Sequence, residues 1–163
     1  MAIPISSAPA ARLWLFHALV AALLPDTALV DGQGYYGDPQ ASLLVCLDEP
    51  GTYQPADIVS VGKVTRDIET SSMVGSGGAG WLAERYSIHV TIEIARGDDA
   101  QSAFERTFAL LDQTINVVRA DPTLGGAVLW ARPQAHDVEV MWTSDHTGRV
   151  GQVEIPISCY QRI

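Results

Sequence analysis

One stretch near the middle of the chain alternates strictly between apolar and polar side chains. Every second position from 86 to 94 is apolar, and the set is Tyr86, Ile88, Val90, Ile92 and Ile94. Because successive side chains of a strand point to opposite faces, this pattern predicts a half-buried strand with one wet face. The chain must therefore fold so that one side of a sheet is buried and the other side stays open.

A helix is predicted directly after this strand. Gly97-Asp98-Asp99 provides a helix start, because an aspartate there satisfies free N–H groups and the positive end of the helix dipole. Asp121-Pro122 ends the helix. Apolar residues in between recur at steps of four and three, which predicts a core-facing stripe of Phe104, Phe108, Leu111, Ile115 and Val118.

Residues 13–24 form an apolar run near the start of the chain, interrupted by His17. No Lys or Arg precedes Arg12, and no clean small-residue cleavage site follows the run. The run is also shorter than the ~20 residues that cross a bilayer. We therefore expect neither a signal peptide nor a membrane anchor here.

A helix is the better interpretation of this run, with Ser6 or Ser7 as its cap and Pro25 as its stop. Its expected core stripe is Leu13, Phe16, Val20 and Leu23. Trp14 and Leu15 lie outside that stripe, so the helix should bury a second side, either within the domain or against a neighbouring subunit.

The other apolar runs predict further strands, at 28–36, 42–47, 58–68, 127–131, 137–142 and 150–159. Gly62 is expected to mark a bulge. Pro156 cannot donate to a ladder, so the last strand should lie at an edge or carry a bulge there. Few helices and strands that are mostly sequence neighbours indicate α+β, a mainly antiparallel sheet with two helices packed against it. The length of 163 residues fits one domain, 1–163.

The charge balance excludes some classes of partner. Ten Lys and Arg stand against nineteen Asp and Glu, a net charge of −9, and Lys63 is the only lysine. A generic nucleic-acid binder or a polybasic membrane surface needs the opposite excess. The two cysteines, Cys46 and Cys159, have no metal-ligand spacing and are expected to be small buried hydrophobes.

A glycine-rich segment, 71–81, matches G-x-G-x-x-G at Gly75, Gly77 and Gly80. A predicted strand follows it rather than a helix, and no Lys-Ser/Thr pair follows Gly80, so we do not expect nucleotide binding. The segment is interpreted as a flexible hairpin loop or as a loop that becomes ordered on a partner. In the second case its apolar contacts would be Met73, Val74 and Trp81.

Histidines and nucleophiles give weak signals. His17 is expected in the core or at an interface, and His89 on the polar strand face. The pairs His136-Asp137 and Asp145-His146 could converge in a hairpin, but they lack metal-ligand spacing, so solvated turns are the favoured interpretation. No nucleophile-elbow motif is present, and we expect no cofactor, no metal and no catalytic residue. Converged carboxylates or histidines in a small soluble enzyme remain the alternative.

The helix-turn block is the most distinctive part of the sequence. It comprises residues 104–111, FERTFALL, and 117–126, VVRADPTLGG. With the N-terminal helix, the strand entry at 57–62 and the long alternating strand, it resembles the tail terminator proteins of long-tailed bacteriophages. The resemblance covers roughly residues 10 to 160.

The resemblance implies a ring-forming α+β subunit, usually in a ring of six. Such a ring caps the finished tail tube at the head–tail junction of the virion, ends tail polymerisation and joins tail to head. Its partners would be further copies of itself, the major tail tube protein and a head-side connector, and DNA would pass through without specific binding or membrane contact. The subunit would be made in the host cytoplasm. Another connector, a stopper or adaptor, is the alternative within the same assembly.

Two groups of residues are candidates in such a ring. For contacts with partners or between subunits these are the loop residues Met73, Val74, Gly75, Gly77, Gly80 and Trp81, together with Trp14 and Pro156. An acidic lumen would repel phosphate and let DNA slide. The acidic candidates for facing that channel are Glu93, Asp98, Asp99 and Glu139.

Overall fold

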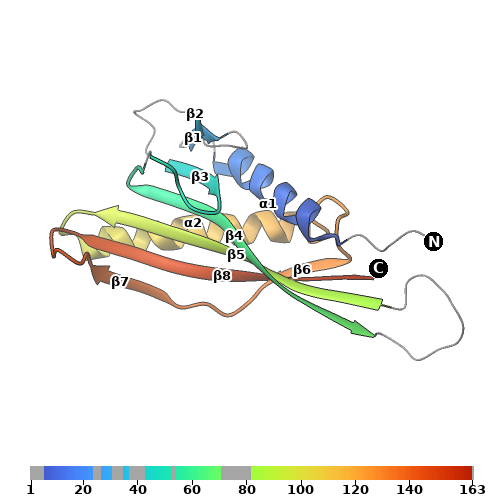
Figure 1. Ribbon diagram of the computed structural model, residues 1–163. Helices are drawn as coiled ribbons and strands as arrows, with labels where there is room; N and C mark the ends of the chain where they lie inside the picture. The colour runs from blue at the N-terminus through green and yellow to red at the C-terminus, as the bar shows by residue number, and fades with distance from the viewer. Residues whose placement is uncertain are drawn as a thin grey trace, which may run out of the picture.

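The computed structural model describes residues 6–23, 27–30, 35–36, 43–52, 54–70 and 82–162. Its two helices are α1 (Ala8–Leu23) and α2 (Ala100–Ala120). The strands are β1 (Thr27–Val30), β2 (Tyr35–Tyr36), β3 (Leu43–Leu47), β4 (Asp57–Thr70), β5 (Leu82–Arg96), β6 (Trp130–Pro133), β7 (Val138–Trp142) and β8 (Arg149–Arg162). Figure 1 shows them in one α+β unit.

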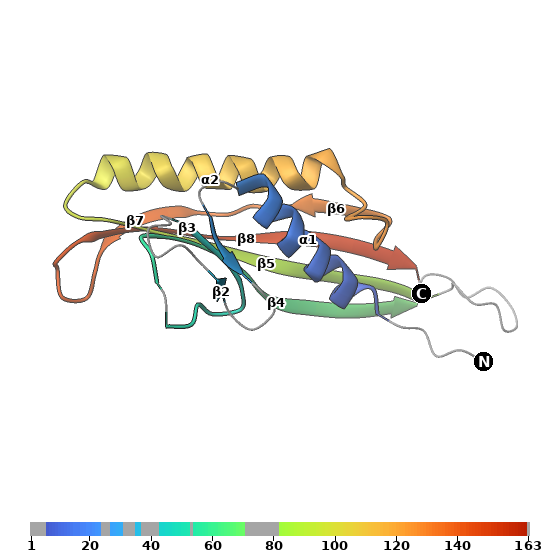
Figure 2. The same cartoon turned by 90° about the horizontal axis from the view of Figure 1, so that it is seen from above.

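The strands form one sheet in the order β2-β1-β3-β4-β5-β8-β6, with β7 also paired to β8. Only the pairs β1–β3 and β3–β4 are parallel, so the sheet is mainly antiparallel as the sequence predicts. Figure 2 shows both helices on the same face of the sheet. The core lies between the helices and that face, and no helix of the described residues covers the opposite face of the long strands β4, β5 and β8.

The alternation of residues 86 to 94 sets the two faces of the sheet. Ile88, Val90, Ile92 and Ile94 are fully buried under the helices. In β8 the matching partners are Ile157, Ile155 and Val153. The strand predicted at 28–36 is described as two short strands, and residues 31–34 between them lie outside the described part.

The buried side of α1 matches the predicted stripe only in part. Phe16 and Leu23 are buried as expected. Ala11, Leu15 and Leu19 are fully buried, whereas Leu13 is 48% exposed and His17 is exposed as well. The residue placed outside the stripe, Leu15, is therefore a core residue. His17 is not in the core of the subunit, and its alternative place at an interface stays a prediction. The helix is apolar around most of its circumference, so apolar spacing alone did not identify the buried side.

The buried side of α2 also differs from the predicted stripe. Leu111 and Val118 are buried as expected, but Phe104 and Phe108 are 41% and 38% exposed. Their rings contact one another, with centroids 4.8 Å apart. The positions nearest the sheet include two threonines instead, Thr107 and Thr114, whose hydroxyls donate to carbonyl oxygens one turn earlier.

Thr107 marks a close approach of α2 to the sheet. It lies over Gly151 of β8, where an added Cβ would be 2.3 Å from Thr107 Oγ1 and 3.1 Å from the carbonyl oxygen of Ala103. A glycine is therefore required at this point because the helix leaves no room for a methyl group.

Replacing Gly151 with alanine is expected to lower the free energy of unfolding by about 1–3 kcal/mol, the usual range for overpacking. Adding Thr107→Ala removes the nearer atom but leaves the backbone oxygen of Ala103, so it should restore part of the loss. Urea unfolding of both variants measures this. Gly51→Ala, where nothing lies within 4 Å of the added Cβ, is the control. A Gly151→Ala variant as stable as this control would contradict the close packing.

Pro156 requires a correction. Its strand, β8, is not at an edge, because it pairs with β5 on one side and with β6 and β7 on the other. It carries no bulge there either, since its register with β5 continues through the pair His89–Pro156. The register leaves Pro156 between the end of β6, where Pro133 faces Ile157, and the start of β7, where Val138 faces Val153. Its carbonyl accepts from Gln134 N at 2.8 Å. The missing N–H of Pro156 thus falls at the break between two short strands, where no ladder bond is lost. The bulge predicted at Gly62 is present, between Val61 and Val64 of β4.

Two buried carboxylates connect the helices to the sheet. Glu84 of β5 is fully buried at the start of α1, where Ser7 N and Ser7 Oγ each donate to its Oε2 at 3.1 Å. Ser6 Oγ and Arg66 Nε bind its other oxygen. The negative charge therefore sits at the positive end of the helix dipole. A serine cap was predicted for this helix, but its partner 77 residues away was not.

Asp57, at the start of β4, is the second of these carboxylates and is 1% exposed. Arg96 Nη1 donates to its Oδ1 at 2.6 Å, and Arg106 Nε to its Oδ2 at 2.8 Å. These bonds connect the beginning of β4, the end of β5 and the first half of α2 in one ion-pair network.

Candidate functional site

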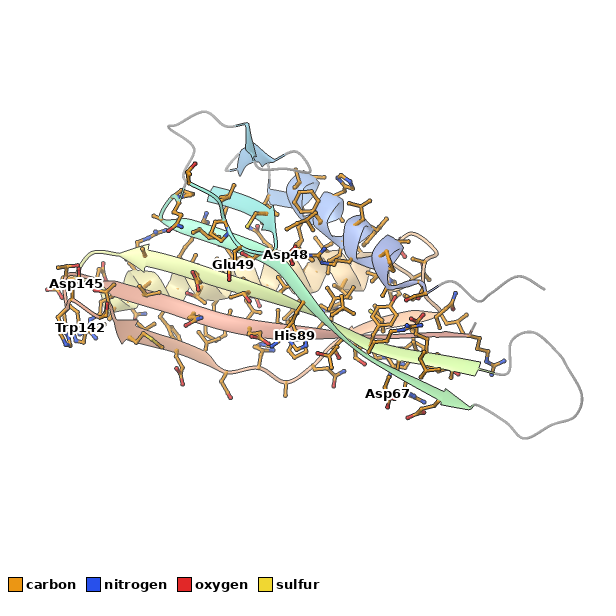
Figure 3. All side chains as sticks on the ribbon, in the orientation of Figure 1. Asp48, Glu49, Asp67, His89, Trp142 and Asp145 are labelled. Atoms are coloured by element: carbon orange, nitrogen blue, oxygen red, sulfur yellow. The ribbon has the colours of Figure 1, made fainter. Side chains whose placement is uncertain are left out.

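The helix-free face of β4, β5 and β8 is hollowed near its middle. The hollow has a volume of about 700 Å³. Figure 3 shows His89 near the middle of the sheet, with Asp48 and Glu49 on the turn that follows β3. The lining residues are mostly polar, and they are Asp48, Glu49, Pro50, Ser60, Gly62, Lys63, His89, Thr91, Glu93 and Glu154.

His89 is the centre of a hydrogen-bonded chain on this face, as its place on the polar side of the strand predicts. Its Nδ1 lies 2.6 Å from Glu154 Oε1, and its Nε2 lies 3.2 Å from Thr65 Oγ1. Lys63 Nζ is 3.4 Å from the same Glu154 oxygen. The hydrogen bond with His89, aided by the charge of Lys63, outweighs partial burial and lowers the pKa of Glu154.

A hydroxyl, an imidazole and a carboxylate in this order form the chain of groups that activates a nucleophile in many hydrolases. The hydroxyl here belongs to Thr65, which does not line the hollow. The arrangement instead fixes the side chains of three adjacent strands.

Arg12 of α1 binds two of the residues that line the hollow. Arg12 Nη2 donates to Asp48 Oδ1 at 2.5 Å, and Arg12 Nε donates to the carbonyl of Gly62 at 2.9 Å. Asp48 has a positive φ of 59°, and its N–H donates to the carbonyl of Val61. One arginine therefore fixes both the turn after β3 and the bulge in β4.

Both cysteines are free and buried, as predicted. Cys46 Sγ is 3.3 Å from Ser60 Oγ. Burial raises the pKa of the Cys46 thiol, and burial together with the charge of Glu84 raises the pKa of Cys159 to about 12. Both thiols are therefore protonated near neutral pH, and neither is an activated nucleophile.

The predicted channel-facing acids separate into different places. Glu93 and Glu139 lie on the same face, each directly opposite Gln152 of β8. Glu93 lines the hollow, where Gln152 Nε2 lies 3.4 Å from its Oε1. Asp98 and Asp99 lie in the turn before α2, and Asp99 accepts from Ser102 N as the helix cap. The sequence-based helix start is thus confirmed, and that carboxylate is held at the helix end.

The predicted partner-contact residues are only partly described. Residues 71–81, which include Met73, Val74, Gly75, Gly77, Gly80 and Trp81, lie outside the described part of the chain. Trp14 is half-buried and packs against the core. Gly125, with a positive φ of 69°, has no room for a side chain because the Trp14 indole lies where its Cβ would be.

The pairs His136-Asp137 and Asp145-His146 do not meet. They lie at opposite ends of β7, and Figure 3 shows Asp145 with Trp142 at the tip of the β7–β8 hairpin. Asp145 lies in the turn between β7 and β8, where hydrogen bonds from the hydroxyls of Thr143 and Thr147 lower its pKa to about 2. Among the described residues, no group of three or more His, Cys, Asp or Glu is arranged to hold a metal.

A row of arginine and aromatic side chains on the same open face was missed by sequence reasoning. Trp130 of β6 faces Tyr160 of β8, and their rings stack with centroids 5.6 Å apart. Arg132 lies over the Trp130 ring and Arg85 over the Tyr160 ring, each 5.0 Å from the centroid. The period-two spacing of Trp130 and Arg132 was the available signal, but only the strand register places the four side chains together.

Compared with models of protein families and with curated proteins, the chain matches none of them. Within the described residues, no helix is long and apolar enough to cross a membrane. The fold, the open sheet face and the sequence resemblance are therefore the observations from which a function can be proposed.

Proposed function

We propose that this chain is a structural virion protein, the tail terminator of a long-tailed bacteriophage. In this proposal, several copies form a ring, usually of six, at the head–tail junction. The ring caps the completed tail tube, stops its polymerisation and joins it to the head-side connector, with DNA passing through its centre.

The observation that supports this proposal is the fold. The sequence resemblance implies a small α+β subunit with helices packed against a mainly antiparallel sheet, and the described chain has that architecture. Its helices occupy one face of the sheet, so the other face and the outer edge of β6 and β7 are available for contacts with further subunits.

The charge of the chain supports a channel that does not grip DNA. The net charge is −9, and the exposed carboxylates of Glu139 and Asp98 lie outside the hollow. We assign these two to the channel surface, where they would repel phosphate. Glu93, which lines the hollow, and Asp99, which caps α2, have other roles in this proposal.

Growing tail tubes test the function directly. The purified chain is added to polymerising major tail tube protein from the same genome, and tube length is measured by electron microscopy. We expect tubes of limited length with a ring at one end. Tubes that grow to their usual length, without density at either end, would contradict the proposal. Binding to the head-side connector but not to tubes would instead favour a stopper or adaptor.

A further inference from the structure

The arginine–aromatic row and the acidic hollow are complementary in charge, and within the row Arg85 already pairs with Glu69 of β4. The row consists of Arg132, Trp130, Tyr160 and Arg85. Arg162 lies two residues beyond Tyr160 on β8 and so points to the same face. The hollow contains four carboxylates, from Asp48, Glu49, Glu93 and Glu154, and the single lysine Lys63.

The row is preorganised for contact with a protein. The two rings stack on each other, and a guanidinium lies 5.0 Å from the centroid of each ring. This leaves little room for a nucleobase or sugar to stack. Trp, Tyr and Arg are the residues that dominate the energetics of protein interfaces, and side chains already fixed lose little entropy on binding.

The carboxylates that line the hollow outnumber the cations that pair with them within the same molecule. Arg12 pairs with Asp48, and Lys63 and His89 both bind Glu154. Glu49 and Glu93 make no ion pair among the described contacts. Every Lys and Arg of the sequence lies in the described part of the chain, so the remaining segments cannot supply a side-chain cation.

The row cannot fill the hollow of its own molecule. Arg85 and Glu93 are eight residues apart on β5, which corresponds to about 26 Å along a strand. Figure 1 shows the long strands twisting between the two regions. A two-fold pair would place the row of each copy in the hollow of the other and would close the assembly at a dimer, which the proposed ring excludes. One copy can, however, offer its row to a second copy while its hollow receives a third.

We propose that the arginine–aromatic row of one copy docks into the acidic hollow of the next copy, with Arg132 opposite Glu93 and Glu49. This inference rests on the proposed ring, because it assigns the two surfaces through which neighbouring subunits meet. The contact is head-to-tail, which is the kind that closes into a ring when the rotation between subunits allows it.

Charge reversal tests the contact. Arg132→Glu and Glu93→Arg should each weaken self-association, and the chain that carries both changes should recover it. Trp130→Ala should weaken association by about thirtyfold, as expected of an interface residue with a large contribution. Glu105→Arg, an exposed reversal on α2, is the control and should assemble normally. Mass is measured by light scattering, and circular dichroism verifies that each variant is folded.

A cross-link tests the head-to-tail arrangement. The native thiols are buried, so cysteines introduced by Glu49→Cys and Arg132→Cys in one chain are the accessible ones. Under mild oxidation we expect a ladder of bands that extends beyond the dimer. Bands that stop at the dimer would overturn the head-to-tail contact in favour of a two-fold one.

The outcomes separate this contact from the proposed function. If Arg132→Glu, Glu93→Arg and Trp130→Ala all still form rings, the proposed contact between the row and the hollow is overturned, but the proposed ring is not. The same conclusion holds if these variants form rings and lose binding to tail tubes. Wild-type protein that stays monomeric with and without tubes overturns both. Rings that depend on the row and the hollow but do not limit tube length support the contact and overturn the terminator function.

Discussion

Replacement of Glu84 by alanine is expected to lower the free energy of unfolding by about 3–5 kcal/mol, the usual effect of breaking a buried ion pair from one side. The carboxylate is fully buried, and its loss would leave Arg66, Ser6 and Ser7 without their common acceptor. The start of α1 would also lose its negative partner. Chemical unfolding of both proteins measures the difference.

The matched control is Glu69→Ala, because Glu69 lies on the neighbouring strand in an exposed pair with Arg85. Its loss should change the free energy of unfolding by no more than about 1 kcal/mol. Equal effects of the two replacements would mean that the buried network contributes nothing specific.

The dependence of stability on pH should also report the contribution of Glu84. Burial acts to raise the pKa of Glu84, but hydrogen bonds from Ser6, Ser7 and Arg66 outweigh it and hold the pKa below the ordinary value of 4.5. A lowered pKa in the folded state stabilises the fold above pH 4.5, and this contribution is lost as the pH falls through the folded value. The stability difference between wild type and Glu84→Gln should therefore shrink below pH 4.5.

Replacement of Asp57 by alanine should have the second-largest effect, a loss of about 3 kcal/mol in the free energy of unfolding. It leaves Arg96 and Arg106 side by side without their shared carboxylate. Both arginine side chains are about one quarter exposed, so water can partly solvate their charges. The loss of stability should therefore fall at the lower end of the range for buried pairs. Urea unfolding measures it.

Asp67→Ala provides the comparison on the same strand, because Asp67 is exposed on β4 (Figure 3). Its effect should stay within about 0.5 kcal/mol. Asp57→Asn should lie between the two, since the amide oxygen still accepts a hydrogen bond while the charge is gone. A stability of Asp57→Ala equal to that of Asp67→Ala would contradict a structural role for the network.

The sequence predicts the elements of this fold better than it predicts the sides of the helices. The alternation of residues 86 to 94 has one interpretation, because period two separates two faces without ambiguity. In α2, two of the buried positions are threonines, Thr107 and Thr114. A prediction from apolar spacing alone leaves these threonines out. It therefore assigns Phe104 and Phe108 to the buried side of the helix instead.

The candidate site was harder to predict from the sequence, because its residues come together only through the register between neighbouring strands. His89, Thr65 and Glu154 come from three strands and meet only because Thr65 pairs with Ser87, and Thr91 with Glu154. The bulge between Val61 and Val64 shifts that register by an amount that no single strand encodes. His89 could be assigned to the polar face from its own strand, but its partners could not.

The hydrogen bonds from Ser7 to Glu84 have a consequence during synthesis of the chain. The start of α1 has its anchor 77 residues later, and Tyr86, which also contacts Ser7, follows at a separation of 79. At translation rates of about 5–20 residues per second, the apolar helix waits roughly 4–16 s before its anchor has been made. During that interval, a chaperone that covers apolar helices would protect the nascent chain from aggregation.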